Sequence, residues 1–354
     1  MKAVNQDDKL FFFERSFFTL DGLWMIETEE MTNWETALKI DVIVWIKLLK
    51  VIIRRLKKYL NLERNDIANL IEILTFRWTI EGWRYEIKQD DDDNRVTIVV
   101  SDCPYKSAMD RNPARKEKQR LICKNMCIPL YNAIVKEYNE NLALERTGCM
   151  GLGAETCDFT FSYEKKASDK AEKRASLKTA RKISNADKLF YFEKNFRTLD
   201  GLWVIETEKE LGWDVALKLD IIVWQRLYKI IFRRVIKYLD VKGNKLEDLV
   251  SILSFIWNCE GNIHDIFQAG ENNFTISIVE CPYIAAMERN PERHNRIESI
   301  CKDMCISYLQ PVIKEFNPKI EIERDKFMGL GHSMCNIILN LKEISKKNNY
   351  RNKF

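Results

Sequence analysis

Histidine is scarce in this chain of 354 residues, which has three histidines and ten cysteines. No Ser-His-Asp set is recognisable, and no phosphate-binding glycine loop precedes a helical pattern. Lysines interrupt the longest apolar stretches, and the N-terminus lacks the apolar core of a signal peptide. These absences exclude a membrane-spanning chain and a P-loop enzyme, and we expect a cytoplasmic protein with no membrane insertion.

The chain also has little net charge. Its formal charge of +4 is too small to indicate a nucleic-acid partner. Basic residues are nevertheless concentrated in residues 165–182, with eight basic and two acidic side chains, and in residues 342–354, with five and one. We interpret these segments as a solvated linker and tail, and docking arms for an acidic partner are the alternative.

A long repeat organises the sequence. Residues 10–28 recur at 189–207 with an offset of 179, and after a one-residue deletion the offset is 178. A nearly gapless repeat of this length indicates duplication of a whole domain, because solenoid repeats are much shorter. The predicted domains are a first lobe (1–164), a basic linker (165–186), a second lobe (187–341) and a basic tail (342–354).

Each lobe is predicted to be α+β. In the first 80 residues, apolar side chains recur at helical spacing and indicate about three helices. Further along, a period of two predicts strands, and a proline predicts the start of a helix. In the first lobe these are strands at 83–87 and 96–100 around an acidic turn at 90–94, a helix from 113 to about 138, and strands at 142–146 and 157–163. We expect helices packed on a small antiparallel sheet in each lobe, and the lobes paired as a pseudo-dimer.

Five cysteines of the first lobe are the main candidate site. Cys123 and Cys127 are four residues apart in the predicted helix, which places their thiols on one face with chelating geometry. Cys149 and Cys157 flank a glycine turn, and Cys103 ends a strand. Soft thiolates favour zinc or an iron–sulfur centre. Core packing and a reactive thiol are the alternatives, whereas a disulfide framework does not suit a reducing compartment.

The second lobe keeps most of these residues. Phe327 stands where the first lobe has Cys149, and His332 lies three residues before a cysteine and is the candidate replacement ligand. A site here should therefore bind metal more weakly. The candidate ligands of the second lobe are Cys281, Cys301, Cys305, Cys335 and His332.

A second candidate site combines carboxylates with aromatic rings. Asp41 and Trp45 share one helical face, and Asp220 and Trp224 are their partners in the second lobe. Such residues can line a small-molecule pocket and act as general acid and base. The alternative is that the carboxylates pair with arginine and that the tryptophans are core residues.

Several motifs resemble the L-2-amino-thiazoline-4-carboxylic acid hydrolase-like family. They are Cys103-Pro-Tyr, Cys123, Glu145-Arg146-Thr147 and Met150-Gly151-x-Gly153-x3-Cys157-Asp158-Phe159. The earlier DGLW and AL-x-x-D patterns resemble a related, uncharacterised archaeal and bacterial domain family. More distantly, the chain is similar to the 4-vinyl-reductase-type ligand-binding domain, whose fold is shared with TRAPP subunits.

The resemblance implies a zinc site held by Cys123, Cys149 and Cys157. Arg146 stands at the position of the family's carboxylate, which leaves Cys127, Glu145 or Cys103 as fourth-ligand candidates. It also implies that, if the chain is an enzyme, it is a hydrolase acting on carbon–nitrogen bonds, with Cys157 or Cys123 and Asp41 as actors.

Three functions follow as hypotheses. The favoured one is a tandem small-molecule-binding protein with a cysteine-based zinc site in the first lobe. The second is a carbon–nitrogen hydrolase of the amino-thiazoline-carboxylate type. The third is a TRAPP-like scaffold for protein interaction. Fold alone does not separate them.

Overall fold

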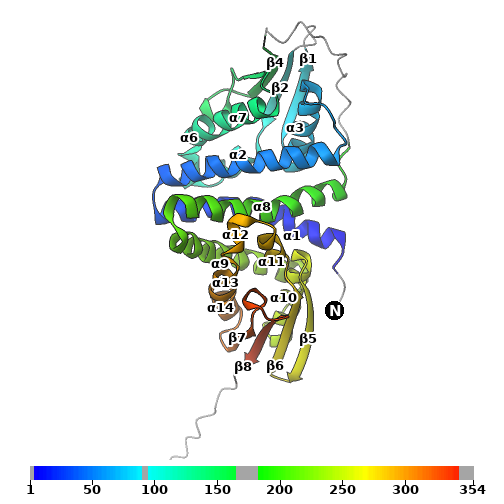
Figure 1. Ribbon diagram of the computed structural model, residues 1–354, viewed down its shortest axis with the longest axis vertical. Coiled ribbons are helices and arrows are strands. Elements are labelled where there is room, and N and C mark those ends of the chain that lie inside the picture. Colours follow the sequence, from blue (N-terminus) through cyan, green and yellow to red (C-terminus); the bar gives the residue numbers. More distant parts are fainter. Residues whose placement is uncertain (1–3, 90–94, 165–181, 343–354) are drawn as a thin grey trace, which may run out of the picture. The chain divides into compact units, whose positions relative to one another are not determined.

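The computed structural model describes residues 4–89, 95–164 and 182–342 (Figure 1). The predicted acidic turn at 90–94 lies outside these residues, as do most of the predicted linker and basic tail. The chain divides into two compact units. We call Thr28–Glu206 the first-repeat unit, and Met1–Glu27 together with Thr207–Phe354 the second-repeat unit.

The first-repeat unit contains the elements of the first lobe and most of one helix from the second. Long helices come first, then a hairpin, short helices and a second hairpin (Figure 1). The elements are α1 (Gln6–Met31, from residue 28), α2 (Trp34–Tyr59), α3 (Ile67–Glu81), β1 (Arg84–Gln89), β2 (Arg95–Asp102), α4 (Pro104–Asp110), α5 (Pro113–Lys116), α6 (Gln119–Ile122), the π-helix η1 (Cys123–Cys127), α7 (Ile128–Tyr138), β3 (Leu142–Glu145), the 3-10 helix η2 (Met150–Leu152), β4 (Cys157–Tyr163) and α8 (Asn185–Leu211, to residue 206).

The second-repeat unit has the same order of elements after its first helix. It takes that helix, α1, from the beginning of the chain. The other elements are α9 (Trp213–Tyr238), α10 (Leu246–Glu260), β5 (Ile263–Gly270), β6 (Asn273–Glu280), α11 (Pro282–Glu288), α12 (Pro291–His294), α13 (Ile297–Ser299), the π-helix η4 (Ile300–Met304), α14 (Cys305–Phe316), β7 (Ile320–Lys326), the 3-10 helix η5 (Met328–Leu330) and β8 (Cys335–Leu341).

Each unit has one four-stranded antiparallel sheet, in the orders β1-β2-β4-β3 and β5-β6-β8-β7. Buried and more exposed side chains alternate along β2, so one face of this strand packs on the core. The buried residues are Val96, Ile98 and Val100. The predicted α+β class with two lobes and antiparallel sheets is therefore confirmed. The pairing of the lobes as a pseudo-dimer stays a prediction.

The helix predicted from 113 to 138 is not continuous. Two short helices, α5 and α6, lead into the π-helix η1, and only then does α7 begin. In η1 the backbone N–H of Ile128 donates to the carbonyl of Cys123, five residues earlier. The corresponding segment of the second-repeat unit, η4, is also π-helical. Such π-turns are frequent at functional sites.

The helix that the first-repeat unit takes from the second repeat is fixed by side chains of α2. Arg55 donates from Nη1 to Asn195 Oδ1 (2.8 Å) and from Nη2 to Thr198 Oγ1 (2.9 Å). One turn further along α2, the hydroxyl of Tyr59 donates to Asp187 Oδ1 at 2.8 Å. These contacts attach α8 to the first-repeat unit at two levels.

The second-repeat unit repeats this arrangement with α1 in the place of α8. Arg234 of α9 donates to the carbonyl of Arg15 (3.0 Å) and to Thr19 Oγ1 (3.1 Å). The hydroxyl of Tyr238 donates to Asp8 Oδ1 at 2.7 Å. Arg55, Tyr59, Asp187 and Thr198 correspond in the repeat to Arg234, Tyr238, Asp8 and Thr19. The first helix of each repeat therefore packs into the unit built from the other.

One contact distinguishes the two helices. In the first-repeat unit, Tyr191 of α8 donates its hydroxyl to the buried carboxylate of Glu81. The corresponding residue of α1 is Phe12, which has no hydroxyl. In the second-repeat unit, Tyr228 of α9 donates instead to Glu260 Oε1 at 2.9 Å. If α1 packed against α3 in place of α8, Glu81 would have no tyrosine hydroxyl as a partner. The contact between Tyr191 and Glu81 therefore favours α8 in the first-repeat unit.

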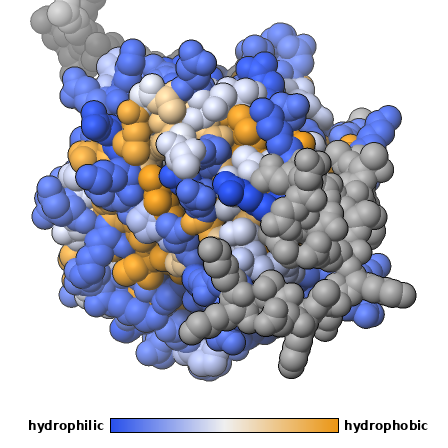
Figure 2. All heavy atoms as spheres, turned by 90° about the horizontal axis from the view of Figure 1, so that it is seen from above, coloured by the Kyte–Doolittle hydropathy of each residue, from blue (hydrophilic) through white to orange (hydrophobic). Residues whose placement is uncertain are grey.

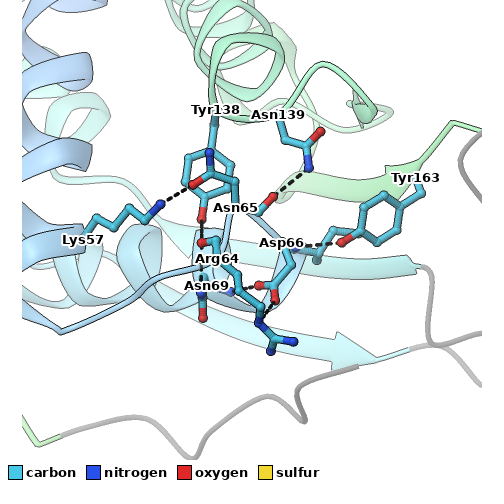
Figure 3. A network of polar contacts seen from close by, with 9 residues as sticks. Lys57, Arg64, Asn65, Asp66, Asn69, Tyr138, Asn139 and Tyr163 are labelled. Carbon is cyan, nitrogen blue, oxygen red and sulfur yellow. Dashed lines mark hydrogen bonds and ion pairs between the residues drawn. The ribbon is translucent and has the colours of Figure 1, made fainter. Parts of the chain in front are cut away.

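A polar network fixes the loop between α2 and α3 (Figure 3). The hydroxyl of Tyr138, at the end of α7, donates to the carbonyl of Arg64 at 3.1 Å. Asn139 Nδ2 donates to the carbonyl of Asn65 at 2.7 Å. The hydroxyl of Tyr163, at the end of β4, accepts the backbone N–H of Ile67 at 3.3 Å. The loop is thereby tied to α7 and β4, which also carry residues of the candidate site.

Tryptophans form much of the two cores. Six tryptophans are retained in both repeats, and all six are at most 3 % exposed, as the alternative of core tryptophans requires. They are Trp24, Trp45, Trp78, Trp203, Trp224 and Trp257. On the face seen in Figure 2, hydrophilic residues surround smaller apolar patches. Within 4–89, 95–164 and 182–342, no helix is long and apolar enough to cross a bilayer.

Candidate functional site

Three of the five candidate cysteines of the first-repeat unit meet. Cys123 opens the π-helix η1, Cys157 opens β4, and Cys149 caps η2 in an extended conformation. The two residues that follow Cys149 contact the other two sulfurs, since Gly151 packs against Cys123 Sγ and the backbone N–H of Met150 donates to Cys157 Sγ. We call these three residues the thiol cluster, and Cys149 is its centre.

The glycine turn brings the cluster together. A Cβ atom at Gly151 would lie 2.2 Å from Cys123 Sγ, so only glycine allows this approach. Gly153 has φ of +107°, a conformation that side chains rarely adopt. The backbone N–H of Met150 donates to Cys157 Sγ at 3.2 Å. The predicted glycine turn therefore packs closely against Cys123, the first residue of the π-helix η1.

Arg146 adds a cation to the cluster. Its guanidinium carbon lies 3.8 Å from the ring centre of Phe159, and Nη1 donates to Cys127 Sγ at 3.7 Å. Its Nε and Nη2 are buried and have no hydrogen-bond partner in the part of the chain that the structure describes. Burial disfavours the charge of Arg146, but nearby Cys127 together with Cys157 and Cys149 raises its pKa.

The environment concentrates negative charge on the central sulfur. Hydrogen bonds from Cys123 and then Cys157 lower the pKa of the Cys149 thiol, and Arg146 acts in the same direction. The pKa of Cys123 and that of Cys157 are raised, in each case first by the hydrogen bond with Cys149 and then by burial. The three thiols therefore influence one another's ionisation, and Cys149 is the one whose pKa is lowered.

The other two candidate cysteines lie beside the cluster. Cys127 is close enough to Cys103 and to Arg77 to interact electrostatically with both. Burial raises the pKa of Cys103 to about 12 and also raises that of Cys127. Cys127 also accepts a hydrogen bond from Arg146.

A buried ion pair continues the site toward α3. Arg77 Nε donates to Glu81 Oε1 at 2.8 Å, and the other carboxylate oxygen accepts Trp83 Nε1 at 3.0 Å. The hydroxyl of Tyr131 accepts Trp78 Nε1 at 2.8 Å and Arg77 Nη1 at 3.2 Å. Sequence reasoning missed this network. The signal that could have revealed it is Glu81-Gly82, which recurs as Glu260-Gly261.

Trp45 and Asp41 of the predicted pocket face different neighbours. The indole of Trp45 lies edge-on to Tyr105, with ring centres 5.6 Å apart, and 5.7 Å from the Arg77 guanidinium carbon. Asp41 is buried and interacts electrostatically with Arg115. Trp45 thus belongs to the aromatic layer beside the site. A pocket lined by both residues stays a prediction.

The second-repeat unit keeps the arginine but not the central thiol. Phe327 replaces Cys149, and the guanidinium carbon of Arg324 lies 4.4 Å from its ring centre. Arg324 Nη2 donates to Cys335 Sγ at 2.7 Å, and Nη1 donates to the carbonyl of Cys301 at 2.8 Å. Burial raises the pKa of Cys301 to about 12. In this unit, therefore, the arginine contacts both Cys335 and Cys301.

The remaining candidates of this unit are placed as follows. His332 is exposed, and its Nδ1 lies 3.0 Å from the Phe327 carbonyl, so it is a residue of the turn. Burial raises the pKa of Cys281 to about 12, and Cys305 is close to Arg324. Asp220 and Trp224 are buried, and Trp224 lies edge-on to a tyrosine, as Trp45 does.

The residues of the thiol cluster do not fit a zinc centre well. A structural zinc ion needs four ligands around one point. Across the described residues, no group of three or more His, Cys, Asp or Glu side chains is arranged to hold a metal ion. The guanidinium of Arg146, close to the same sulfurs, would also repel a dication. Zinc and an iron–sulfur centre stay predictions that this geometry does not support.

The two halves of the chain match different family models. Residues 24–161 match the model described as L-2-amino-thiazoline-4-carboxylic acid hydrolase. Residues 180–324 match a family of unknown function, DUF6125. The chain has no match among curated proteins and none among solved structures. The match at 24–161 supports the resemblance of the first lobe to the L-2-amino-thiazoline-4-carboxylic acid hydrolase-like family. The matched residues include the whole thiol cluster.

Proposed function

We propose that the first-repeat unit is the active half of a hydrolase that cleaves a carbon–nitrogen bond in a small molecule bearing a carboxylate. The observation that carries the proposal is the distribution of the thiol cluster. Its central residue, Cys149, is present in the half that matches the amino-thiazoline-carboxylate hydrolase model, and the other half has Phe327 there.

The cluster has the groups that this chemistry needs. An activated thiolate is a strong nucleophile, and a nearby proton donor assists the leaving amine. Cys149 would add to the amidine-like carbon, and a carbon–nitrogen bond would break as Cys123 or Cys157 gives a proton to the nitrogen. Water would then displace the sulfur and return the proton to that cysteine. The net change is the addition of one water to the substrate.

Arg146 supports recognition of the substrate in this proposal. Its Nε and Nη2 have no partner among the described residues, and a guanidinium binds a carboxylate in a bidentate manner. The printed name of the matching family describes a substrate that carries a carboxylate. Arg146 would therefore orient the ligand with its reacting carbon toward Cys149.

The test is hydrolysis of L-2-amino-thiazoline-4-carboxylate by the full chain, followed by mass spectrometry. We expect turnover, and a loss of about 10³-fold in kcat/KM for Cys149→Ser. Cys335→Ser, at the position that corresponds to Cys157, is the matched control and should retain activity. Absence of turnover in the wild-type chain, or equal turnover in Cys149→Ser, would refute the proposal.

For the second-repeat unit we propose ligand binding or structural support without thiol chemistry. The observation that favours this role is the side chain of Phe327, which supports Arg324 where Cys149 would stand. Small-molecule binding by both units, without catalysis, is the second candidate function for the chain. Equilibrium dialysis with the same compound separates the two, because binding without turnover supports this candidate.

A further inference from the structure

One segment of the first-repeat unit is strongly basic. Residues 104–127, which run from α4 to the end of η1, have seven basic and two acidic side chains. The corresponding residues 282–305 of the second-repeat unit have four lysines or arginines and four acidic side chains. The excess of positive charge therefore belongs to one copy of the repeat, and the common fold does not require it.

Three of the seven cations are paired within the protein. Arg115 and Lys118 form ion pairs with Glu29, and Lys106 forms one with Asp110. The other four are exposed and form no ion pair with any residue that the structure describes. They are Arg111, Lys116, Arg120 and Lys124. We call these four residues the basic patch.

Most of the basic patch forms a row. Lys116, Arg120 and Lys124 are spaced by four residues, and the backbone between α5 and η1 stays in the right-handed helical region. Residues four apart lie on one side of a helix, so these three side chains follow one another along the surface. Gln119 Nε2 donates to Asp110 Oδ1 at 3.0 Å, which holds the row beside the end of α4.

The same row differs in the second-repeat unit. The corresponding residues are His294, Glu298 and Lys302, and all three are exposed. An acidic side chain therefore stands in the middle of this row, and the two units present opposite charges at that position.

Two exposed leucines accompany the basic patch. Leu121 is 43 % exposed and Leu152 is 37 % exposed, and no other large apolar side chain is exposed in the part of the first-repeat unit that the structure describes. Leu121 follows Arg120 in α6. Leu152 follows Gly151, at which a Cβ atom would lie 3.6 Å from the carbonyl oxygen of Gln119, so η2 lies against α6. The exposed apolar side chains of this unit are therefore beside its unpaired cations.

From this combination we propose that the first-repeat unit binds the surface of an anionic lipid bilayer through the basic patch, with Leu121 and Leu152 entering the headgroup region. Acidic headgroups attract cations close to the bilayer, and apolar side chains that enter the interface add to the binding. The protein would adsorb to the bilayer without spanning it. This proposal goes beyond the hydrolase function and does not depend on it.

Nucleic acid is the other polyanion that a basic surface can bind. Proteins that bind single strands stack the bases on aromatic side chains. Among its described residues, the first-repeat unit has no exposed aromatic side chain, and the apolar groups at the basic patch are leucines. These observations favour a lipid surface.

The experiment is sedimentation of the full chain with vesicles of phosphatidylcholine, either pure or mixed equally with phosphatidylglycerol. We expect binding to the mixed vesicles and none to the neutral ones. Because salt screens exposed charges, binding should weaken as NaCl rises from about 0.05 M to about 0.5 M.

A pair of charge variants locates the binding surface. Arg111→Glu with Lys124→Glu should weaken binding by about tenfold or more, because both cations lie in the basic patch. Arg289→Glu with Lys302→Glu is the matched control, since it makes the same charge change at the corresponding positions of the second-repeat unit. It should weaken binding by about twofold at most. The basic segments 165–182 and 342–354 are unchanged in both variants, so a difference between the variants belongs to the patch.

A third variant tests the apolar part of the surface. Leu121→Ser introduces the residue that the second repeat has at Ser299, and it should weaken binding without changing thermal unfolding, since Leu121 is exposed. The proposal would be overturned by a wild-type chain that does not bind the mixed vesicles or binds the neutral ones equally. Equal losses in the two charge variants, or wild-type binding by Leu121→Ser, would also overturn it.

Binding of a single-stranded RNA oligonucleotide in place of the vesicles would assign the basic patch to nucleic acid and refute the lipid proposal. No substrate takes part in these measurements, so failure of the hydrolase proposal leaves their result interpretable.

Discussion

We predict that the hydrogen bond from Tyr191 to Glu81 stabilises the packing of α8 in the first-repeat unit. Tyr191 is fully buried and donates to a carboxylate that also accepts Arg77 at 2.8 Å and Trp83 at 3.0 Å. Tyr191→Phe removes one donor and leaves the ring. Phenylalanine already occupies the corresponding place on α1, at Phe12, which shows that the ring suits this position of the repeat.

The expected cost follows from the remaining partners. A hydrogen bond to a charged group contributes about 1.5 to 3 kcal/mol. Because Glu81 keeps two partners in the variant, we expect the lower end, about 1.5 kcal/mol in the free energy of opening. Such a change raises the opening equilibrium constant about tenfold.

Hydrogen exchange measured by mass spectrometry is the suitable assay, since a chain of two units need not unfold in one step. Tyr191→Phe should speed exchange about tenfold in peptides from 67–81 and 185–206, and leave 246–260 unchanged. Tyr228→Phe is the matched variant, because Tyr228 donates to Glu260. It should affect 246–260 and leave 67–81 unchanged. Unchanged exchange in 67–81 of Tyr191→Phe would refute the role of this contact.

Two further predictions concern the glycine turn. Gly151→Ala should destabilise the first-repeat unit by about 1 to 3 kcal/mol, since its Cβ would lie 2.2 Å from Cys123 Sγ; thermal unfolding that matches the wild type would contradict this. Asp158 accepts hydrogen bonds from two backbone N–H groups, each at 2.7 Å. Burial raises the pKa of Asp158, but these two bonds and the hydrogen bond from the Thr147 hydroxyl lower it, and the net shift is downward. Its stabilisation is thus complete above about pH 4 and is lost as the pH falls through the lowered folded pKa. Exchange in 147–158 should rise in that acidic range and not in Asp158→Asn, and the same pH response in both would disprove it.

Much of the fold could be predicted from the sequence because the signals are local. Period-two alternation predicted the strands, as at Val96, Ile98 and Val100, whose side chains are buried. The exchange of α1 and α8 could not be predicted this way. Residues of the two helices correspond so closely that hydrophobic periodicity fits either unit, and only single differences such as Phe12 and Tyr191 separate them.

The candidate site was predictable in composition but not in arrangement. Spacing favoured Cys123 and Cys127 as partners on one helical face. The structure has a π-helix there, and Cys123 Sγ lies against Gly151 while Cys127 contacts Arg146. A π-turn leaves no simple mark in residue spacing, so this division of the thiols could not be read from it.

The arginine of the site shows how the two repeats have diverged together. In the first-repeat unit Arg146 lies over Phe159, and Cys149 is free to join the other sulfurs. In the second-repeat unit Ile337 replaces that aromatic ring, and Phe327, at the position of the lost thiol, provides the ring for Arg324. A cation against an aromatic face is stabilised by the ring quadrupole. Each unit therefore has one aromatic ring against its arginine, and the central thiol is present in the unit whose ring comes from the strand. Exchanging the pair, with Phe327→Cys and Ile337→Phe together, should give the second-repeat unit a thiol cluster of its own, whereas Phe327→Cys alone leaves Arg324 without its ring. A double variant that is less stable than the single one would show that the ring and the thiol are independent.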